Sequence, residues 1–316
     1  PRRKIRKRNM EQITTPLDPY RLIKKFLTER DVVQLSKRQY EFNINRFVSW
    51  AMLQGKSFGE LGISDVLKYK QSLLDENKTD LTVASYMTTL KLFYGWLAVN
   101  DITKDLTTSI RINRTYRTFR KRSLSMEQSN QLLKTFDTST PGGKRDYAIT
   151  NLMLRNGLRE IEVTRMNVGD IIDYNAKQKA IVIQRKGKTE KDATIPLSTK
   201  AEEAIVEYLL ARPGNWQNND PLFISYARRN KNKRLIPHHI SVMIKKHLKL
   251  AGIDHPMVTA HSLRHTAATM LLADGLTEYD VMIFMGHANF TTTQIYTRQK
   301  EKELIFNKNI IKSLDY

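Results

Sequence analysis

The chain has 316 residues, 40% of them hydrophobic, which is long enough for two domains with separate cores and excludes a disordered protein. It contains no cysteine, which excludes disulfides, thiolate nucleophiles and cysteine-ligated metals and suits the cytoplasm. The 53 Lys and Arg against 32 Asp and Glu give a net charge of +21, which favours a polyanionic partner because a soluble domain gains only self-repulsion from it. No apolar run approaches the roughly 18 residues of a membrane helix, so we expect no membrane partner.

The positive charge is concentrated in three clusters that lack acidic residues. Residues 1–9 contain six basic side chains, residues 111–122 contain six, and residues 228–234 contain five. One such cluster is typical of a solvated loop or tail, but three at distant positions favour nucleic acid. None has the pattern of an amphipathic basic helix, which would bind a membrane surface. The residues that we expect to contact DNA are Arg111, Arg114, Arg117, Arg120, Lys121, Arg122, Arg228 and Arg229.

In chain order, the first predicted domain is helical and covers residues 18–106. Apolar residues recur at spacings of three and four from Tyr40 to Ala51 and from Val83 to Leu97. Ser36 and Asp80 are the expected N-cap residues of these two helices. Four helices would make a compact all-α domain.

A second domain is expected over residues 124–300, after a basic linker at 107–123 that has no apolar periodicity. Ser125 and Gln128 form a capping box that starts its first helix. The stretch 144–166 is helical in pattern, with an internal Asn-Gly break.

Two β-strands are expected next, at 179–184 and 193–197, joined by a basic turn. Helical patterns resume from Thr199, Pro237 and Thr259. The predicted fold class is therefore mainly α: a helical N-terminal domain followed by an α-rich domain with a small antiparallel sheet.

The segment HSLRH, residues 261–265, is the first candidate for chemistry. His261 and Arg264 are three apart on one helical face, so both could reach a single anion. His261 and His265 have the spacing of a zinc pair, but the metalloprotease glutamate is missing and no third ligand is evident. We expect no metal here. A structural role of the histidines inside the core is the alternative.

A second arginine, a lysine and a tyrosine complete a set suited to phosphoryl transfer. Guanidinium groups grip phosphate oxygens in pairs, so Arg159 and Arg264 could together neutralise a pentavalent phosphorus centre. Surrounding positive charge favours the phenolate of Tyr296 as a nucleophile. Lys186 has cations on both sides and suits a proton donor to a leaving alkoxide. The set predicts transfer of a DNA phosphoryl group to the tyrosine.

Three motifs in this order resemble the catalytic domain of the tyrosine recombinase (phage integrase) family. They are NGLREIE, HSLRHTAATMLLADG and MGHANFTTTQIYT, and the resemblance spans roughly residues 124–300. The layout is similar to the compact Xer-like and transposon integrase members. The resemblance implies a site of six catalytic residues and one supporting acid: Arg159, Lys186, His261, Arg264, His287 and Tyr296, with Glu162 in support.

The family resemblance also implies a mechanism and an assembly. Tyr296, nine residues after His287, would form a 3′-phosphotyrosine while Lys186 protonates the leaving 5′ oxygen and His261 assists removal of the phenolic proton. No cofactor is needed, because the covalent link conserves the bond energy. The helical first domain would be a SAM-like core-binding domain that clamps duplex DNA. The tail, 301–316, would dock on a neighbour within a synaptic tetramer, or, alternatively, pack on its own subunit.

Several alternatives stay open at this level. The catalytic lysine could be Lys188, because Lys188 aligns with the family's lysine when positions are counted back from Pro196. Glu160 stands where the family usually has an apolar residue. The same chemistry would serve a type IB topoisomerase or a telomere resolvase, and an inert DNA-binding regulator is a further reading. The segment 1–17 is too short for an arm-binding domain, so we expect a simple recombinase or a trimmed chain, with a mobile element as its source.

Overall fold

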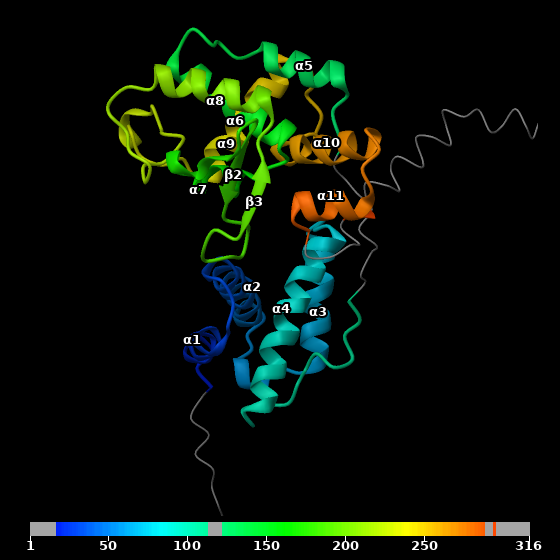
Figure 1. Cartoon of the computed structure of the whole chain (residues 1–316). Helices are drawn as coiled ribbons and strands as arrows, with labels where there is room; N and C mark the ends of the chain where they lie inside the picture. The colour runs from blue at the N-terminus through cyan, green and yellow to red at the C-terminus, as the bar shows by residue number, and fades with distance from the viewer. Residues whose placement is uncertain (1–16, 113–121, 288–292, 295–316) are drawn as a thin grey trace, which may run out of the picture. The chain divides into compact units, whose positions relative to one another are not determined.

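The computed structural model divides into two compact units, Pro1–Arg117 and Thr118–Tyr316 (Figure 1). The residues that the structure describes are 17–112, 122–287 and 293–294. The division falls within the predicted linker, 107–123. Thr107 and Ile110 are nevertheless buried, and Ile110 belongs to the hydrophobic core of the first unit. The beginning of the basic stretch is therefore part of that unit.

Over residues 17–112, the first unit consists of four helices around an aromatic core, as the sequence predicts. Its elements are α1 (Pro19–Glu29), α2 (Gln34–Leu53), the 3₁₀ turn η1 (Phe58–Glu60), α3 (Ile63–Asp75) and α4 (Asp80–Val99). The ring centroids of Phe26 and Phe93 lie 5.3 Å apart, and those of Phe47 and Tyr69 lie 5.0 Å apart, both edge to face. Such pairs contribute about 0.5–1.5 kcal/mol each beyond the burial of their area.

The two N-caps predicted for this unit are wrong by one to three residues. α2 begins at Gln34 after Val33, which provides no side-chain cap, so Ser36 lies inside the helix. α4 is capped by Thr79, whose Oγ1 accepts from the backbone N–H of Thr82 at 3.3 Å. Asp80 is instead the first helical residue, where its charge favours the positive end of the helix dipole.

The second unit is mostly helical with one small sheet, which confirms the predicted fold class. Its elements are α5 (Met126–Lys134), α6 (Pro141–Arg155), α7 (Glu160–Arg165), η2 (Val168–Asp170), β1 (Ile171–Asn175), β2 (Gln178–Ile183), β3 (Ala193–Pro196), α8 (Thr199–Ala211), η3 (Arg228–Asn230), α9 (Pro237–Leu250), α10 (Ala260–Ala273) and α11 (Glu278–Met285). The capping box of Ser125 and Gln128 is present at the start of α5. The predicted strands are confirmed as β2 and β3.

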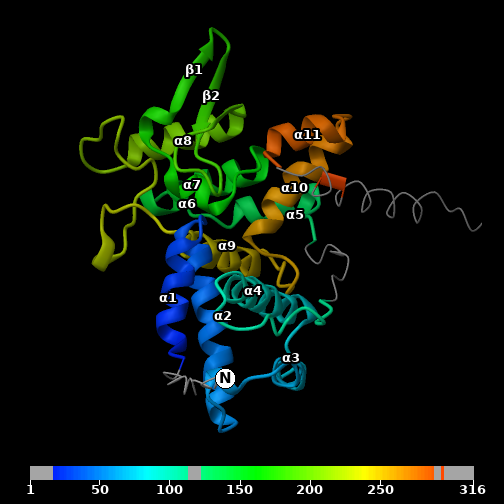
Figure 2. The ribbon, with the colours of Figure 1, turned by 90° about the horizontal axis from the view of Figure 1, so that it is seen from below.

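The sheet is antiparallel in the order β1-β2-β3, and β1 was not predicted. Ile181 on β2 lies opposite Ile171 on β1 and Ile195 on β3. Beyond Ile171 the residues of β1 are exposed, so this strand carries no alternating apolar signal. The hairpin of β1 and β2 projects from the helical body (Figure 2).

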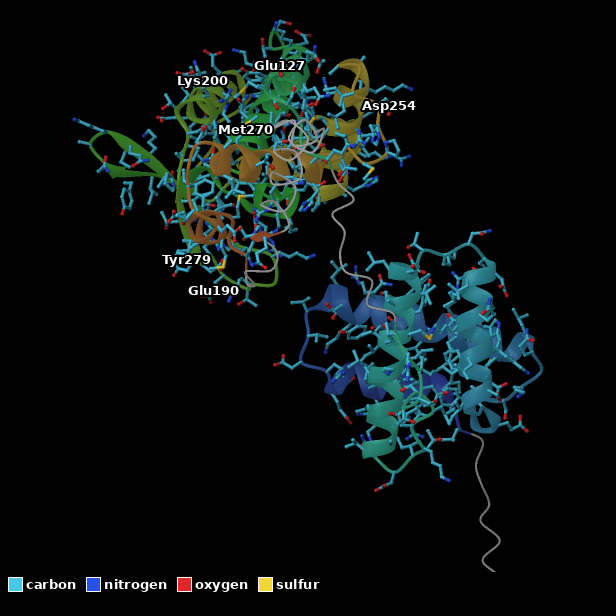
Figure 3. All side chains as sticks on the ribbon, turned by 90° about the vertical axis from the view of Figure 1, so that its right-hand side faces the viewer. Glu127, Glu190, Lys200, Asp254, Met270 and Tyr279 are labelled. Atoms are coloured by element: carbon cyan, nitrogen blue, oxygen red, sulfur yellow. The ribbon has the colours of Figure 1, made fainter. Side chains whose placement is uncertain are left out.

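The helix α10 lies inside the second unit, where it packs against α6, α9 and α11. Most of its residues are buried, including Arg264 and His265. In Figure 3, Glu190 of the turn between β2 and β3 and Tyr279 of α11 lie at the same end of this unit, away from Glu127 and Lys200. None of the helices that the structure describes is long and apolar enough to cross a membrane.

Candidate active site

The first motif lies at the tight connection between α6 and α7. Asn156 ends α6, and Gly157 follows with a φ of 63°, a left-handed conformation that favours glycine. A Cβ on Gly157 would lie 2.6 Å from the Sδ atom of Met285, so α11 also approaches the backbone here too closely for a side chain. The turn therefore fixes where α7 begins and brings Arg159 to its N-cap position.

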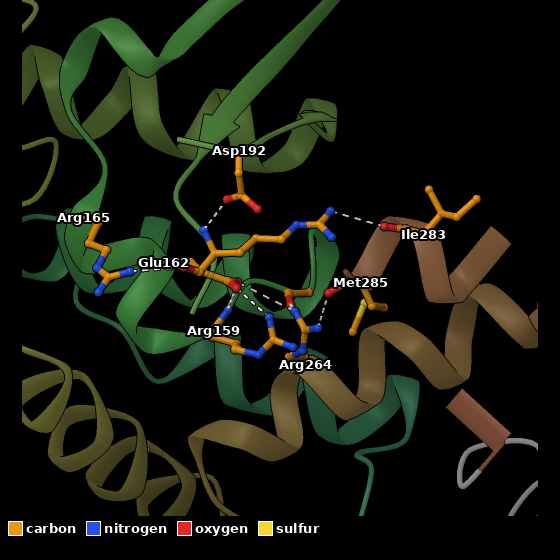
Figure 4. Close-up of polar contacts among 9 residues, drawn as sticks. Arg159, Glu162, Arg165, Asp192, Arg264, Ile283 and Met285 are labelled. Atoms are coloured by element: carbon orange, nitrogen blue, oxygen red, sulfur yellow. Dashed lines mark hydrogen bonds and ion pairs between the residues drawn. The ribbon is translucent and has the colours of Figure 1, made fainter. Parts of the chain in front are cut away.

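Arg159 and Glu162 are joined by two hydrogen bonds (Figure 4). The backbone N–H of Arg159 donates to Oε2 of Glu162 at 2.8 Å, and its Nη1 donates to Oε1 at 2.6 Å. The carboxylate is only 1% exposed, whereas the Arg159 side chain is 22% exposed. Glu162 is therefore a buried acid that holds a guanidinium which still reaches the surface.

Arg264 reaches the same carboxylate from α10. Its Nη1 lies 3.7 Å from Oε2 of Glu162 and donates to the carbonyl of Gly157, while its Nη2 donates to the carbonyl of Met285. Its side chain is 3% exposed. Three segments, α7, α10 and the end of α11, are thus tied together by one guanidinium and one carboxylate.

Glu160, which departs from the apolar residue usual at this position, has a partner in the structure. Its Oε1 accepts a hydrogen bond from the Oγ of Ser241 on α9. The polar side chain is thereby accommodated at the packing contact between α7 and α9.

The pair Gly286 and His287 closes the end of α11. Gly286 has a φ of 61°, and its N–H donates to the carbonyl of Ile283 at 3.0 Å, while the N–H of His287 donates to the carbonyl of Met282 at 3.0 Å. This is the Schellman arrangement, with glycine in the left-handed position. The Nδ1 of His287 lies 2.9 Å from Oγ1 of Thr293, which orients the ring.

Several positive groups converge on His287 and lower the pKa of its imidazole to about 3. Burial is the largest cause, followed by the positive charges of Arg264, Arg159, His261 and Arg185. His287 itself is 9% exposed, whereas His261 at the start of α10 is exposed. The structure thus brings Arg159, Arg264 and both histidines into one electropositive region, which is suited to an anion.

The turn after β2 carries both candidate lysines. Lys186 and Lys188 are exposed, and the backbone N–H of Lys188 donates to the carbonyl of Arg185 at 3.1 Å. Gly187 between them has a φ of 88°, as required at the third position of a type II turn.

Arg185 is a residue of this region that the sequence did not single out. In the sequence it is one of several cations beside Lys186, but its side chain reaches the end of α11, where its Nη2 donates to the carbonyl of Ile283 at 3.2 Å. Nothing in the sequence distinguishes this arginine from the other basic residues of the turn.

The remaining predicted residues have varied positions. Tyr296, Arg114, Arg117, Arg120 and Lys121 lie outside the described residues. Arg111, Arg122, Arg228 and Arg229 are exposed.

One cation of the basic clusters, Arg234, has a structural role. Arg234, in the cluster 228–234, donates through Nη1 to the carbonyls of Thr164 and Met166 at 2.9 Å each, so it anchors the loop after α7. Within the described ranges, no three His, Asp or Glu side chains gather closely enough to hold a metal ion.

Comparison with known proteins places the chain in a family. Residues 122–303, more than half of the chain, match the phage integrase family. The chain therefore belongs to the phage integrase family, the class of tyrosine recombinases that its fold and its arginine-rich site resemble.

Its relatives are Xer recombinases. The chain is 30% identical to tyrosine recombinase XerD of Xanthomonas axonopodis pv. citri, over 88% of this chain and 91% of that protein. It is 37% identical to tyrosine recombinase XerC of Caldanaerobacter subterraneus subsp. tengcongensis, over 59% of this chain and 50% of that protein. A crystal structure of the XerH site-specific recombinase bound to palindromic difH substrate has the same fold, with a TM-score of 0.75 and 19% sequence identity. The match covers 93% of this chain and 85% of that chain. The chain is a site-specific tyrosine recombinase.

Proposed function

We propose that the chain cleaves and rejoins duplex DNA at specific sites, with Tyr296 forming a 3′-phosphotyrosine. The observation that supports this most is the convergence of Arg159 and Arg264 on one buried acid, Glu162, with His287 near both guanidinium groups. The proposed nucleophile follows His287 by nine residues. Residues 293 and 294, which the structure describes, lie between them in the chain.

The charges of the cluster favour a phosphate. Two guanidinium groups share the single carboxylate of Glu162, so one positive charge remains uncompensated before Arg185 is counted. A phosphodiester in this position would gain charge-assisted hydrogen bonds, and the additional negative charge of its transition state would gain more. His287 would then act as a neutral hydrogen-bond donor, because its lowered pKa keeps the imidazole uncharged near pH 7.

The proton transfers are assigned to the exposed groups of the site. The phenolic proton of Tyr296 would leave with the help of His261, and the oxygen would attack phosphorus as the P–O5′ bond breaks. Lys186 would donate a proton to the departing 5′ oxygen. In the second step a 5′-hydroxyl of the partner duplex attacks the phosphotyrosine, reforms a P–O5′ bond and returns the proton to the phenol. The bond energy is conserved, so no cofactor takes part.

Strand exchange between two sites requires more than one subunit. We propose a tetramer on two DNA sites, with the apolar residues of the tail 301–316 docking on a neighbouring subunit. The exposed Arg111, Arg122, Arg228 and Arg229 are proposed to contact the phosphate backbone. The proposed role is integration, excision or resolution of a mobile element, and such a substrate makes the cytoplasm the proposed site of action.

The test begins with the DNA site. Selection of bound DNA from a random pool, followed by mapping of the cleavage point, would supply a nicked target duplex. With that duplex, the wild type is expected to form a denaturant-resistant adduct, and Tyr296→Phe is expected to form none. An adduct with Tyr296→Phe would mean that another residue is the nucleophile. Relaxation of supercoiled DNA without any site preference would instead favour a topoisomerase.

The tail has its own test. Deletion of residues 301–316 is expected to leave binding to a single site intact and to abolish recombination between two sites. Undiminished recombination by the shortened chain would contradict docking in trans.

A further inference from the structure

Arg185 connects the turn that carries the lysines to the end of α11. It directly precedes Lys186, and its Nη2 donates to the carbonyl of Ile283 at 3.2 Å. The guanidinium passes against the backbone of Gly286, where an added Cβ would lie 1.8 Å from Nη1. Only a glycine at this position admits the arginine.

The backbone of Arg185 is held as firmly as its side chain. Its N–H donates to Oδ1 of Asp192 at 2.8 Å, and its carbonyl accepts from Nη1 of Arg165 at 3.2 Å. Asp192 stands at the other end of the turn, where its own N–H donates to the carbonyl of Ile183 at 3.0 Å. Hydrogen bonds therefore join the two ends of the lysine turn to each other and join the turn to Arg165 of α7. The side chain of Arg185 adds a third connection, to the end of α11.

The carbonyl that Arg185 reaches belongs to the turn that presents His287. The oxygen of Ile283 also accepts the N–H of Gly286 at 3.0 Å, while the carbonyl of Met285 accepts from Arg264. Carbonyls at a helix C-terminus carry partial negative charge, so two guanidinium groups stabilise this end of α11. One of them, Arg264, comes from the predicted catalytic set, and the other comes from the lysine turn.

We infer that Arg185 is a positioning residue, which fixes the separation between the lysine turn and the segment of Gly286 and His287. The inference rests on the proposed function for its effect on rate. Its charge also contributes to the lowered pKa of His287, after burial and the charges of Arg264, Arg159 and His261. A misplacement of about 1 Å can cost on the order of 10²-fold in rate.

The first experiment asks whether Arg185 acts through the lysine turn. It compares single-turnover cleavage of the nicked target duplex with that of a duplex whose bridging 5′ oxygen is replaced by sulfur. A thiol has a pKa of about 8.5 and leaves as a thiolate without a proton donor. Arg185→Gln is expected to cleave the oxygen duplex about 10- to 100-fold more slowly at saturating protein, where a change in DNA affinity does not affect the rate.

The sulfur duplex should restore most of that loss, as it should for Lys186→Ala. Arg185→Lys keeps the positive charge and one donor nitrogen, and it should cleave the oxygen duplex at least tenfold faster than Arg185→Gln. Lys177→Gln removes the same charge from the exposed turn before β2 and serves as the matched control. Cleavage by Arg185→Gln at the wild-type rate, or an equal loss on both duplexes, would overturn the inference.

The second experiment needs no DNA and separates this inference from the proposed function. The amide hydrogens of Gly286 and His287 should exchange faster in Arg185→Gln than in the wild type or in Lys177→Gln. Unchanged exchange would show that Arg185 does not hold the end of α11. If the wild type forms no adduct with DNA, the proposed function fails, while this measurement still decides the positioning role.

A double-mutant cycle gives an independent measure of the contact. Gly286→Ala adds a methyl group against the guanidinium and strains the left-handed backbone. In the background of Arg185→Ala only the backbone strain remains, so the loss of unfolding free energy should be smaller than in the wild type. Equal losses in the two backgrounds would contradict the contact.

Discussion

The arginine cluster and the lysine turn of the second unit are built in opposite ways. Arg264 is 3% exposed and donates to two backbone carbonyls, and Glu162 is 1% exposed between two guanidinium groups. Lys186 and Lys188 are exposed, and the contacts of their turn are made by its backbone: Arg185 donates to Asp192 at the base, and the side chain of Gln184 donates to the carbonyl of Lys188 at 2.8 Å. The arginines are therefore oriented by contacts within the protein, whereas the lysine side chains extend from an exposed turn.

This difference corresponds to two requirements of the proposed chemistry. Charge stabilisation works best when the donors are already oriented, because no free energy is then spent on reorganisation during the reaction. A proton donor has to reach one particular leaving oxygen, and an exposed lysine on a short turn can do so. Substitutions in the cluster should therefore change stability and rate together, and substitutions at the tip of the turn should change rate alone.

The largest effect is expected from Lys186→Ala. Loss of a general acid typically costs about 10²- to 10⁴-fold in rate, and the melting temperature should not change because the side chain is exposed. Single-turnover cleavage and thermal unfolding measure the two quantities. Lys188→Ala is the matched comparison, and a larger rate loss there than at Lys186 would transfer the acid role to Lys188.

A somewhat smaller rate effect is expected from Arg264→Lys. Lysine keeps the charge but has one nitrogen in place of the two, Nη1 and Nη2, that donate to the carbonyls of Gly157 and Met285, so the cleavage rate should fall about 10²- to 10³-fold. The melting temperature should fall as well. A variant that cleaves slowly but has the melting temperature of the wild type would show that Arg264 does not stabilise the fold. That result would contradict the distinction between the arginine cluster and the lysine turn.

Glu162→Gln tests the buried acid. The amide keeps the size of the side chain but loses the charge that faces Arg159 and Arg264, so the free energy of unfolding should fall by about 1–3 kcal/mol. Chemical denaturation measures this. Glu190→Gln in the exposed turn is the control, and an equal change for both variants would contradict the distinction between interior and turn.

A further effect is expected in the pH dependence of stability. The pKa of His287 is lowered to about 3 in the folded chain, while an unfolded histidine has a pKa of about 6.5. Between these values the unfolded state binds the additional proton, so the contribution of His287 is fully present above pH 6.5 and is lost as the pH falls toward 3.

The unfolding free energy of the wild type minus that of His287→Gln should therefore shrink by about 1.4 kcal/mol per pH unit below pH 6.5. Denaturation curves between pH 4.5 and 7.5 would measure it. A difference that does not depend on pH would show that the imidazole is not held in a buried, positively charged environment.

The elements that the sequence predicted well are those with a strong local pattern. The helices that begin at Thr199 and Pro237 and the strands β2 and β3 have apolar periodicity, and the capping box at Ser125 depends on residues three apart. β1 was missed because most of it is exposed, and the caps Ser36 and Asp80 were misplaced because several polar residues near each helix start could serve. Local patterns locate an element better than they locate its ends.

The sequence by itself determined the order of the motifs, the helical character of both units and the set of residues suited to phosphoryl transfer. These depend on side-chain chemistry and on neighbours within one or two turns. Only the tertiary structure decided which carbonyls the arginines hold. Arg264 donates to Gly157, 107 residues away, and Arg185 donates to Ile283, 98 residues away. Such contacts form only when separate helices pack, and the same packing excludes the water that would otherwise let His287 keep its ordinary pKa.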